Sequence, residues 1–149
     1  MLVPSGLWGL VAATDPLPPY RLKMGARLAP LGGLAAFWRP RITPLIVARA
    51  RGGWVVDLLP QEHAAALDAG ALGGRLVRVE IVEDGPSGRR AIGHAGKALK
   101  GRLARAILEA DARGPQAIAR LDVDNLTLDL SVRETADGAA RVVFRRTGG

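Results

Sequence analysis

Alternating apolar and polar positions predict two β-hairpins in the second half of this 149-residue chain. Residues 75–84 (RLVRVEIVED) alternate apolar and charged side chains with the period of two that is typical of a half-buried strand. The DGPSG turn follows, and residues 89–95 (RRAIGHA) are expected to return as the partner strand. A second hairpin is predicted over about residues 123–146, around the turn RETADG.

A longer period predicts an amphipathic helix that begins near Lys97. Its apolar stripe recurs at steps of three and four residues and consists of Leu99, Leu103, Ile107 and Ala110. Gly114 is expected to end this helix, because glycine readily adopts the left-handed conformation found at helix ends. The helix therefore has one face suited to a core and another that is strongly basic.

The first half of the chain carries shorter signals. The apolar run at residues 5–13 is too short to distinguish a buried strand from a helical turn. Local signals predict a helix over about residues 40–50, a strand over residues 54–60 and a short helix over residues 61–70. These elements together predict one α/β or α+β domain over residues 1–149, with a mixed sheet, two β-hairpins and a basic amphipathic helix.

The net charge of +7 is unevenly distributed along the chain. Residues 1–56 contain seven basic residues and one acid, Asp15, and residues 89–105 contain six basic residues and no acid. A fold that brings these two stretches together would concentrate positive potential in one place. We therefore expect an anionic partner, such as nucleic acid, a nucleotide or phosphate. The alternative is an arginine-rich surface that is simply solvated.

Several classes of protein are disfavoured by what the sequence lacks. Without cysteine there is no disulfide framework, thiolate metal site or thiol nucleophile, which is compatible with a cytoplasmic protein. No run of eighteen apolar residues spans a membrane, and the first residues do not resemble a secretory signal. The histidines, His63 and His94, form no metal motif, and no phosphate-binding glycine loop or dinucleotide fingerprint occurs. We expect no cofactor and no metal site.

Two groups of residues carry candidate chemistry. On the predicted helix, Lys97, Lys100 and Arg105 are expected to form a row of cations without acids one turn away to neutralise them, which would suit a polyanion. A solvated polar face is the alternative. Glu62 follows the strand at residues 54–60 and is a candidate general base, with His63 beside it. The alternative there is a helix cap and a surface histidine.

The segment SGLWGLVAATDPLPPYRLKMGARL, with AAFW after it, resembles the YaaA family of bacterial peroxide-stress proteins. The family pattern is Ser-Gly-Leu-aromatic-Gly, then Pro-Tyr-Arg-Leu-x-Met-Gly, then an aromatic–Trp pair. The residues that satisfy it are Ser5, Gly6, Leu7, Trp8, Gly9, Tyr20, Arg21, Leu22, Met24, Gly25, Phe37 and Trp38. The resemblance covers about residues 5–112.

Later positions follow the family pattern with substitutions. Asp57 stands where the family has Asn, Glu62 keeps the acid, and His63 replaces the usual Tyr. The late pattern Lys-x-x-Arg-Gly-x-x-x-Arg is met by Lys97, Lys100, Gly101 and Arg105, with lysine in place of the first arginine.

The resemblance implies a compact α/β fold with a basic cleft lined by the PYRLxMG and KxxRG residues. It also implies a link to lowering free intracellular iron under peroxide stress, and binding to duplex and branched DNA. The chain is expected to be an N-terminally shortened member that resembles the C-terminal part of the YaaA fold, without the helix–hairpin–helix segment credited with DNA binding. A protein partner or self-association would then cover apolar surface left exposed.

Three functions follow as alternatives. The first is a non-enzymatic stress-response protein that binds DNA. The second is an enzyme acting on a nucleoside, nucleotide or other small anionic substrate, with Glu62 as the acid/base group and Tyr20 and Trp38 stacking a base. The third is a subunit of a larger assembly. The candidate binding residues are Tyr20, Arg21, Lys23, Arg27, Trp38, Lys97, Lys100 and Arg105. Because no Cys/His cluster is present, any effect on iron is expected to be indirect.

Overall fold

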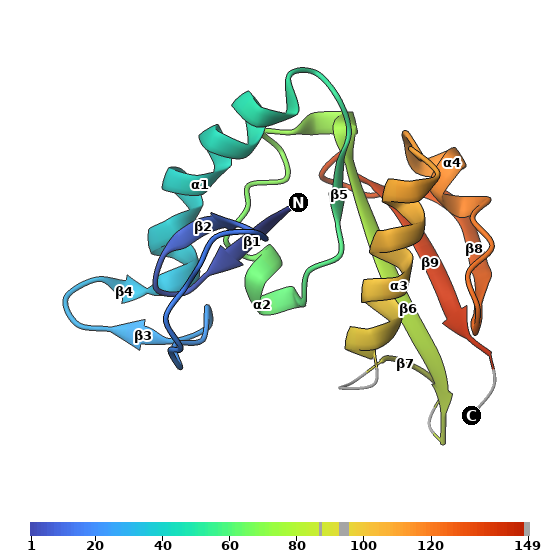
Figure 1. Cartoon of the computed structure of the whole chain (residues 1–149), viewed down its shortest axis with the longest axis horizontal. Helices are drawn as coiled ribbons and strands as arrows, with labels where there is room; N and C mark the ends of the chain where they lie inside the picture. Colours follow the sequence, from blue (N-terminus) through green and yellow to red (C-terminus); the bar gives the residue numbers. More distant parts are fainter. Residues whose placement is uncertain (87, 93–95, 148–149) are drawn as a thin grey trace. The chain divides into compact units, whose positions relative to one another are not determined.

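The computed structural model of the chain describes residues 1–86, 88–92 and 96–147 and divides into two compact units (Figure 1). The N-terminal unit contains Met1–Gly52 and Leu59–Ala71, and the C-terminal unit contains Gly53–Leu58 and Leu72–Gly149. Both units contain helices and strands, and the larger sheet mixes parallel and antiparallel pairs. The predicted α+β class is therefore confirmed.

The N-terminal unit is built from two short hairpins and two helices. Its elements are β1 (Leu2–Ser5), β2 (Gly9–Ala12), β3 (Arg27–Leu28), β4 (Gly32–Gly33), α1 (Leu34–Ala50) and α2 (Gln61–Ala64). The apolar run at residues 5–13 therefore belongs to a tight antiparallel hairpin, in which β1 pairs with β2. A buried cluster of Met24, Leu34, Ile42 and Ala66 forms the core of this unit.

Helix α1 begins at Leu34, six residues before the predicted start at Pro40. Both Pro40 and Pro44 lie inside the helix. Their spacing of four residues places them on one side of the helix, and both are exposed, so water can reach the backbone groups that lack a helical hydrogen bond. The helix ends at Ala50, after which Arg51 adopts a left-handed φ of 46°.

The C-terminal unit contains a five-stranded mixed sheet. Its elements are β5 (Val55–Asp57), η1 (Gly73–Arg75), β6 (Leu76–Gly85), β7 (Gly88–Ala91), α3 (Gly96–Glu109), α4 (Pro115–Ala119), β8 (Leu126–Glu134) and β9 (Ala140–Arg146). The strand order is β5-β6-β9-β8, and β7 pairs with β6. The pairs β6–β7 and β8–β9 are antiparallel, which confirms both predicted hairpins. Residues 93–95 of the predicted return strand lie outside the described residues.

The core of this unit lies between the sheet and helices α3 and α4, which cover one face of the sheet in Figure 1. Val77, Val79 and Ile81 of β6 share a buried cluster with Leu99 and Leu103 of α3. The amphipathic helix is therefore confirmed, and the alternation along β6 explains why the intervening residues remain polar.

The predicted end of that helix is wrong. Helix α3 ends at Glu109, and Asp111 follows with a left-handed φ of 44°. Gly114 instead precedes α4, with φ 85°. Gly114 therefore marks the start of α4 rather than the end of α3, and Pro115 occupies the first turn of α4. None of the helices in the described part of the chain is long and apolar enough to cross a membrane.

Candidate functional site

The turn between β1 and β2 and the segment PYRLKMG contact each other within the N-terminal unit. Ser5 Oγ shares a hydrogen bond of 2.5 Å with the Tyr20 hydroxyl and accepts the backbone N–H of Trp8 at 3.0 Å. A Cβ added to Gly6 would lie 2.6 Å from the carbonyl oxygen of Leu22. Only glycine permits this close approach of two backbones. The two most distinctive stretches of the sequence thus form one local structure.

Trp38 holds this turn in place from helix α1. Its indole N–H donates to the Gly6 carbonyl oxygen at 2.9 Å, and its ring lies directly against Gly9. Phe37 meets the same ring edge to face, with 5.0 Å between the ring centroids. The indole N–H is therefore used in packing the turn. A role for Trp38 in stacking a base stays a prediction.

The three cations of the adjoining segment, Arg21, Lys23 and Arg27, are all exposed. None of them is ion-paired with an acid among the described residues. The same is true of every basic residue of the N-terminal unit, which has seven basic and three acidic residues. Positive charge on this unit is therefore uncompensated.

Glu62 and His63 lie on α2 in the same unit. The Glu62 side chain is 46% exposed, and its Oε1 lies 3.7 Å from His63 Nδ1, which is beyond hydrogen-bonding distance. The Nδ1 atom is buried and has no hydrogen-bond partner among the described residues. The Glu62 carboxylate also lies 3.1 Å from the position of a Cβ on Gly25. No lysine or arginine of this unit forms an ion pair with Glu62, and its role as a general base stays a prediction.

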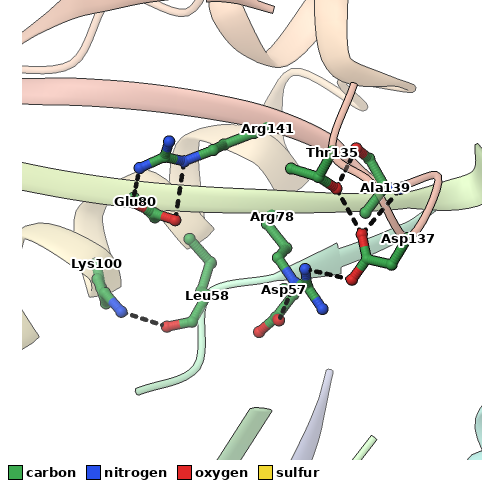
Figure 2. Close-up of polar contacts among 9 residues, drawn as sticks. All are labelled: Asp57, Leu58, Arg78, Glu80, Lys100, Thr135, Asp137, Ala139 and Arg141. Carbon is green, nitrogen blue, oxygen red and sulfur yellow. Dashed lines mark hydrogen bonds and ion pairs between the residues drawn. The ribbon is translucent and has the colours of Figure 1, made fainter. Parts of the chain in front are cut away.

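A charged cluster lies at the C-terminal end of β5 in the other unit (Figure 2). Asp57 is only 8% exposed and pairs in register with Arg78 of β6. Arg78 Nε lies 3.9 Å from Asp57 Oδ2, and Arg78 Nη1 lies 2.7 Å from Asp137 Oδ2. Arg78 thus joins a buried carboxylate on the edge strand to the loop that precedes β9.

Lys100 and Glu80 extend this cluster. Lys100 Nζ donates to the Leu58 carbonyl oxygen at 2.8 Å. Partial burial lowers the pKa of Lys100 below its ordinary value of 10.5, while the carboxylates of Asp57 and Glu80 act in the opposite direction. Glu80 accepts two hydrogen bonds from Arg141, at 3.0 and 2.6 Å. Lys100 is therefore tied to the end of β5.

The prediction that α3 carries a row of cations without neutralising acids is wrong in two respects. Arg105 forms an ion pair of 2.7 Å with Glu109, one helical turn further on. Lys100 turns toward the sheet rather than into solvent. Lys97 is exposed, and it makes no ion pair with the other described residues. The expected polyanion-binding row is thus reduced to Lys97 and a neutralised Arg105.

The stretch at residues 89–105 is also less basic than its sequence indicates. Arg89 pairs with Asp129 at 2.7 Å, and Arg90 pairs with Glu83 at 2.9 Å. Eight basic residues of the C-terminal unit are ion-paired: Arg78, Arg89, Arg90, Arg105, Arg113, Arg141, Arg145 and Arg146. The C-terminal unit still has fourteen basic and eleven acidic residues, so what distinguishes the N-terminal unit is that none of its lysines and arginines is ion-paired with a described acid.

The polar cluster on β6 was not anticipated, although the sequence held a signal for it. Arg78 and Glu80 are the charged positions that alternate with the buried valines of β6, and the sequence alone did not indicate their partners. The pairing of β6 with β9 brings Arg141 to Arg78, and Arg141 then reaches Glu80. Within the described residues, no group of three or more histidine, aspartate or glutamate side chains could hold a metal ion.

We expect Asp137→Asn to weaken the acid-dependent loss of stability. The Thr135 hydroxyl, at 2.5 Å, and the Arg78 guanidinium hold the pKa of Asp137 below its ordinary value of 3.8. A carboxylate with a lowered folded-state pKa stabilises the protein above its unfolded-state pKa, and this stability is lost as pH falls through the folded-state pKa. The effect should stay below about 1 kcal/mol, because the side chain is 35% exposed.

Urea denaturation at a series of pH values from about 6 to about 2 measures this effect. The wild-type midpoint should fall more steeply than that of Asp137→Asn. Asp122→Asn is the control, because Asp122 is exposed and has no ion pair among the described residues. An equally steep fall in Asp137→Asn would contradict the role of this carboxylate.

Comparisons with known proteins give consistent results. Residues 1–131 match the family model described as peroxide stress protein YaaA. The match therefore extends beyond residue 112, where the resemblance in the sequence was expected to end. A UPF0246 protein of Streptomyces coelicolor is 38% identical over 122 residues, covering 81% of this chain and 46% of that protein. UPF0246 proteins of Methylibium petroleiphilum and Variovorax paradoxus are 38% and 35% identical, covering 95% and 97% of this chain and 56% of each relative. The chain thus spans about half the length of these relatives.

Proposed function

The chain belongs to the YaaA family of peroxide stress proteins, and from this premise we propose that it binds nucleic acid through the exposed basic segment of its N-terminal unit. The family description supplies the peroxide-stress context. Binding to nucleic acid is the further step, and it requires a location with access to nucleic acid, such as the cytoplasm.

One observation carries the proposal. Arg21, Lys23 and Arg27 are exposed within seven residues of each other, and no acid neutralises them in the described part of the chain. Cations on a nucleic-acid-binding surface must be available to phosphates, and an ion pair within the protein competes with that contact. The contrast with the C-terminal unit, where eight arginines are ion-paired, supports a ligand-binding role for the N-terminal cations.

The candidate cations of α3 are expected to contribute unequally to the binding of nucleic acid. Lys97 is available to an anion, whereas Arg105 would first have to leave Glu109. Lys100 would have to give up the Leu58 carbonyl oxygen. We therefore propose that Lys97 contributes more to binding than Arg105 or Lys100.

The enzymatic alternative has weaker support. An acid/base group that acts on a bound anion should lie beside the cations that hold the substrate. Glu62 is instead 46% exposed, and within its own unit it forms no ion pair with a lysine or arginine. Nucleic-acid binding by a stress-response protein is therefore the function we favour.

The test compares two double variants that remove the same charge. Arg21→Ala/Lys23→Ala removes two cations that are not ion-paired, and Arg90→Ala/Arg113→Ala removes two cations that are ion-paired. Binding to a fluorescently labelled 30-base-pair duplex is measured by anisotropy at about 50 to 200 mM NaCl. The first variant should lose about tenfold or more in affinity, and its salt slope should fall by about two.

The control variant should change affinity much less, because its cations are already neutralised. Equal losses in the two variants would mean that only net charge matters and that the basic segment is not a site. A wild-type protein that does not bind the duplex or its separated strands at the lowest salt would refute nucleic-acid binding altogether.

A further inference from the structure

Two aromatic side chains near the basic segment (Arg21, Lys23 and Arg27) are exposed to solvent. Trp8 is 48% exposed and Tyr20 is 37% exposed. Tyr20 hydroxyl and the backbone N–H of Trp8 both bond to the same atom, Ser5 Oγ. Ser5 is itself 3% exposed, so a buried residue holds the Tyr20 hydroxyl and the backbone of Trp8 close together.

The cations are part of the same local structure. Arg21 follows Tyr20 directly, and the backbone of Leu22 and Lys23 lies against Gly6 in the turn that carries Trp8. The only ring–ring contact among the described residues joins Phe37 to Trp38, so neither Trp8 nor Tyr20 is stacked on another aromatic side chain. Exposed aromatic residues and cations without an ion pair therefore belong to one local structure, which we call the Trp8–Tyr20 platform (Trp8, Tyr20, Arg21 and Lys23).

This combination distinguishes between forms of nucleic acid. A duplex presents phosphates, but its base faces are stacked on each other, whereas a single strand presents both phosphates and base faces. Surfaces that bind single strands combine cations along the backbone with aromatic side chains on which bases stack. A purely electrostatic duplex site has no need of exposed aromatic rings.

We propose that the Trp8–Tyr20 platform binds single-stranded nucleic acid, with bases stacked on Trp8 and Tyr20 and phosphates held by Arg21 and Lys23. This inference rests on the nucleic-acid binding proposed above and specifies the form of the ligand. The ring of Tyr20 is held by its own hydroxyl, so it is oriented before the ligand arrives.

The test uses the full chain and three labelled probes of equal strand length. They are a dT oligonucleotide of about 20 nucleotides, an abasic strand of the same length and the duplex of dT with dA. Wild-type protein should bind the dT strand about tenfold more tightly than the abasic strand. Trp8→Ala should remove about tenfold of the dT affinity and leave abasic affinity and the salt slope unchanged.

Two further variants control for folding and for loss of a tryptophan. Trp8→Phe retains an aromatic face and should restore most of the dT affinity. Trp54→Ala removes a tryptophan of similar exposure, 44%, from the C-terminal unit and should leave dT affinity unchanged. Far-UV circular dichroism verifies that each variant is folded.

Each alternative outcome has a definite meaning. Equal affinity for the dT and abasic strands, with duplex binding retained, would overturn the platform and leave the proposed nucleic-acid binding standing. Failure to bind any of the three probes would overturn both. If Trp8→Ala leaves dT affinity unchanged but abolishes self-association in sedimentation equilibrium, the surface is a protein interface and the platform is likewise overturned.

Discussion

Gly9→Ala is expected to lower the free energy of unfolding by about 3 kcal/mol or more. Gly9 has φ 79°, a left-handed conformation that costs a residue with a Cβ about 1–2 kcal/mol. A Cβ at this position would also lie 2.6 Å from the ring of Trp38. The ring cannot easily move away, since its N–H is bonded to Gly6 and Phe37 packs against it.

Gly32→Ala is the matched control. Gly32 has φ 78°, almost the same as Gly9, but no atom lies within 4 Å of its Cβ position. It should therefore show only the cost of the left-handed backbone, about 1–2 kcal/mol. Urea denaturation, monitored by tryptophan fluorescence, measures the free energy of unfolding of both variants. Equal midpoints for the two would show that Trp38 is not fixed against the turn.

Two glycines of the family pattern have a structural role in the turn between β1 and β2. Gly6 and Gly9 are needed because backbone and an indole ring approach them closely. The glycines of the turn therefore position Trp8 and the basic segment rather than contact a ligand themselves. Loss of nucleic-acid binding in Gly9→Ala would follow from loss of this local structure.

Phe144→Ala is expected to destabilise the C-terminal unit by about 3–5 kcal/mol. Phe144 is 1% exposed, and it belongs to the buried cluster that also contains Val79 and Leu103. It lies on β9, which is hydrogen-bonded on both sides, to β6 and to β8. Truncation at this interior position would leave a cavity that the surrounding sheet cannot close.

Leu128→Ala provides the comparison for Phe144→Ala. Leu128 pairs with Phe144 across the antiparallel strands, but it lies on the edge strand β8 and is 41% exposed. Its loss should cost about 1 kcal/mol, because much of its surface is already in water. Denaturant midpoints from far-UV circular dichroism test both variants. A small effect of Phe144→Ala would mean that the second hairpin is not an integral part of the core.

The position of Phe144 also bears on the family comparison. The family model matches residues 1–131, whereas β9 begins at Ala140. Yet β9 lies inside the sheet and supplies Val142 and Phe144 to the core. Residues beyond the family match are therefore required to complete the sheet on which Asp57 and Arg78 are placed.

Local patterns were sufficient for several elements of the fold. Alternation predicted both hairpins, and the stripe of Leu99 and Leu103 predicted helix α3, because each pattern reflects the period of the element that it forms. The turn between β1 and β2 was missed because a four-residue apolar strand has no distinctive period. The start of α1 was missed because Pro40 suggested a first turn, although it lies inside the helix.

The sequence by itself determined the family, the α+β class and the excess of positive charge. Only the tertiary structure decided which of those charges remain available. Arg89 pairs with Asp129 and Arg141 pairs with Glu80, and these partners are 40 and 61 residues apart in the chain. Such pairs depend on the order of the strands in the sheet, and local periodicity carries no information about that order. The cations at Arg21 and Lys23 remain unpaired because folding brings no acid of the described chain to them.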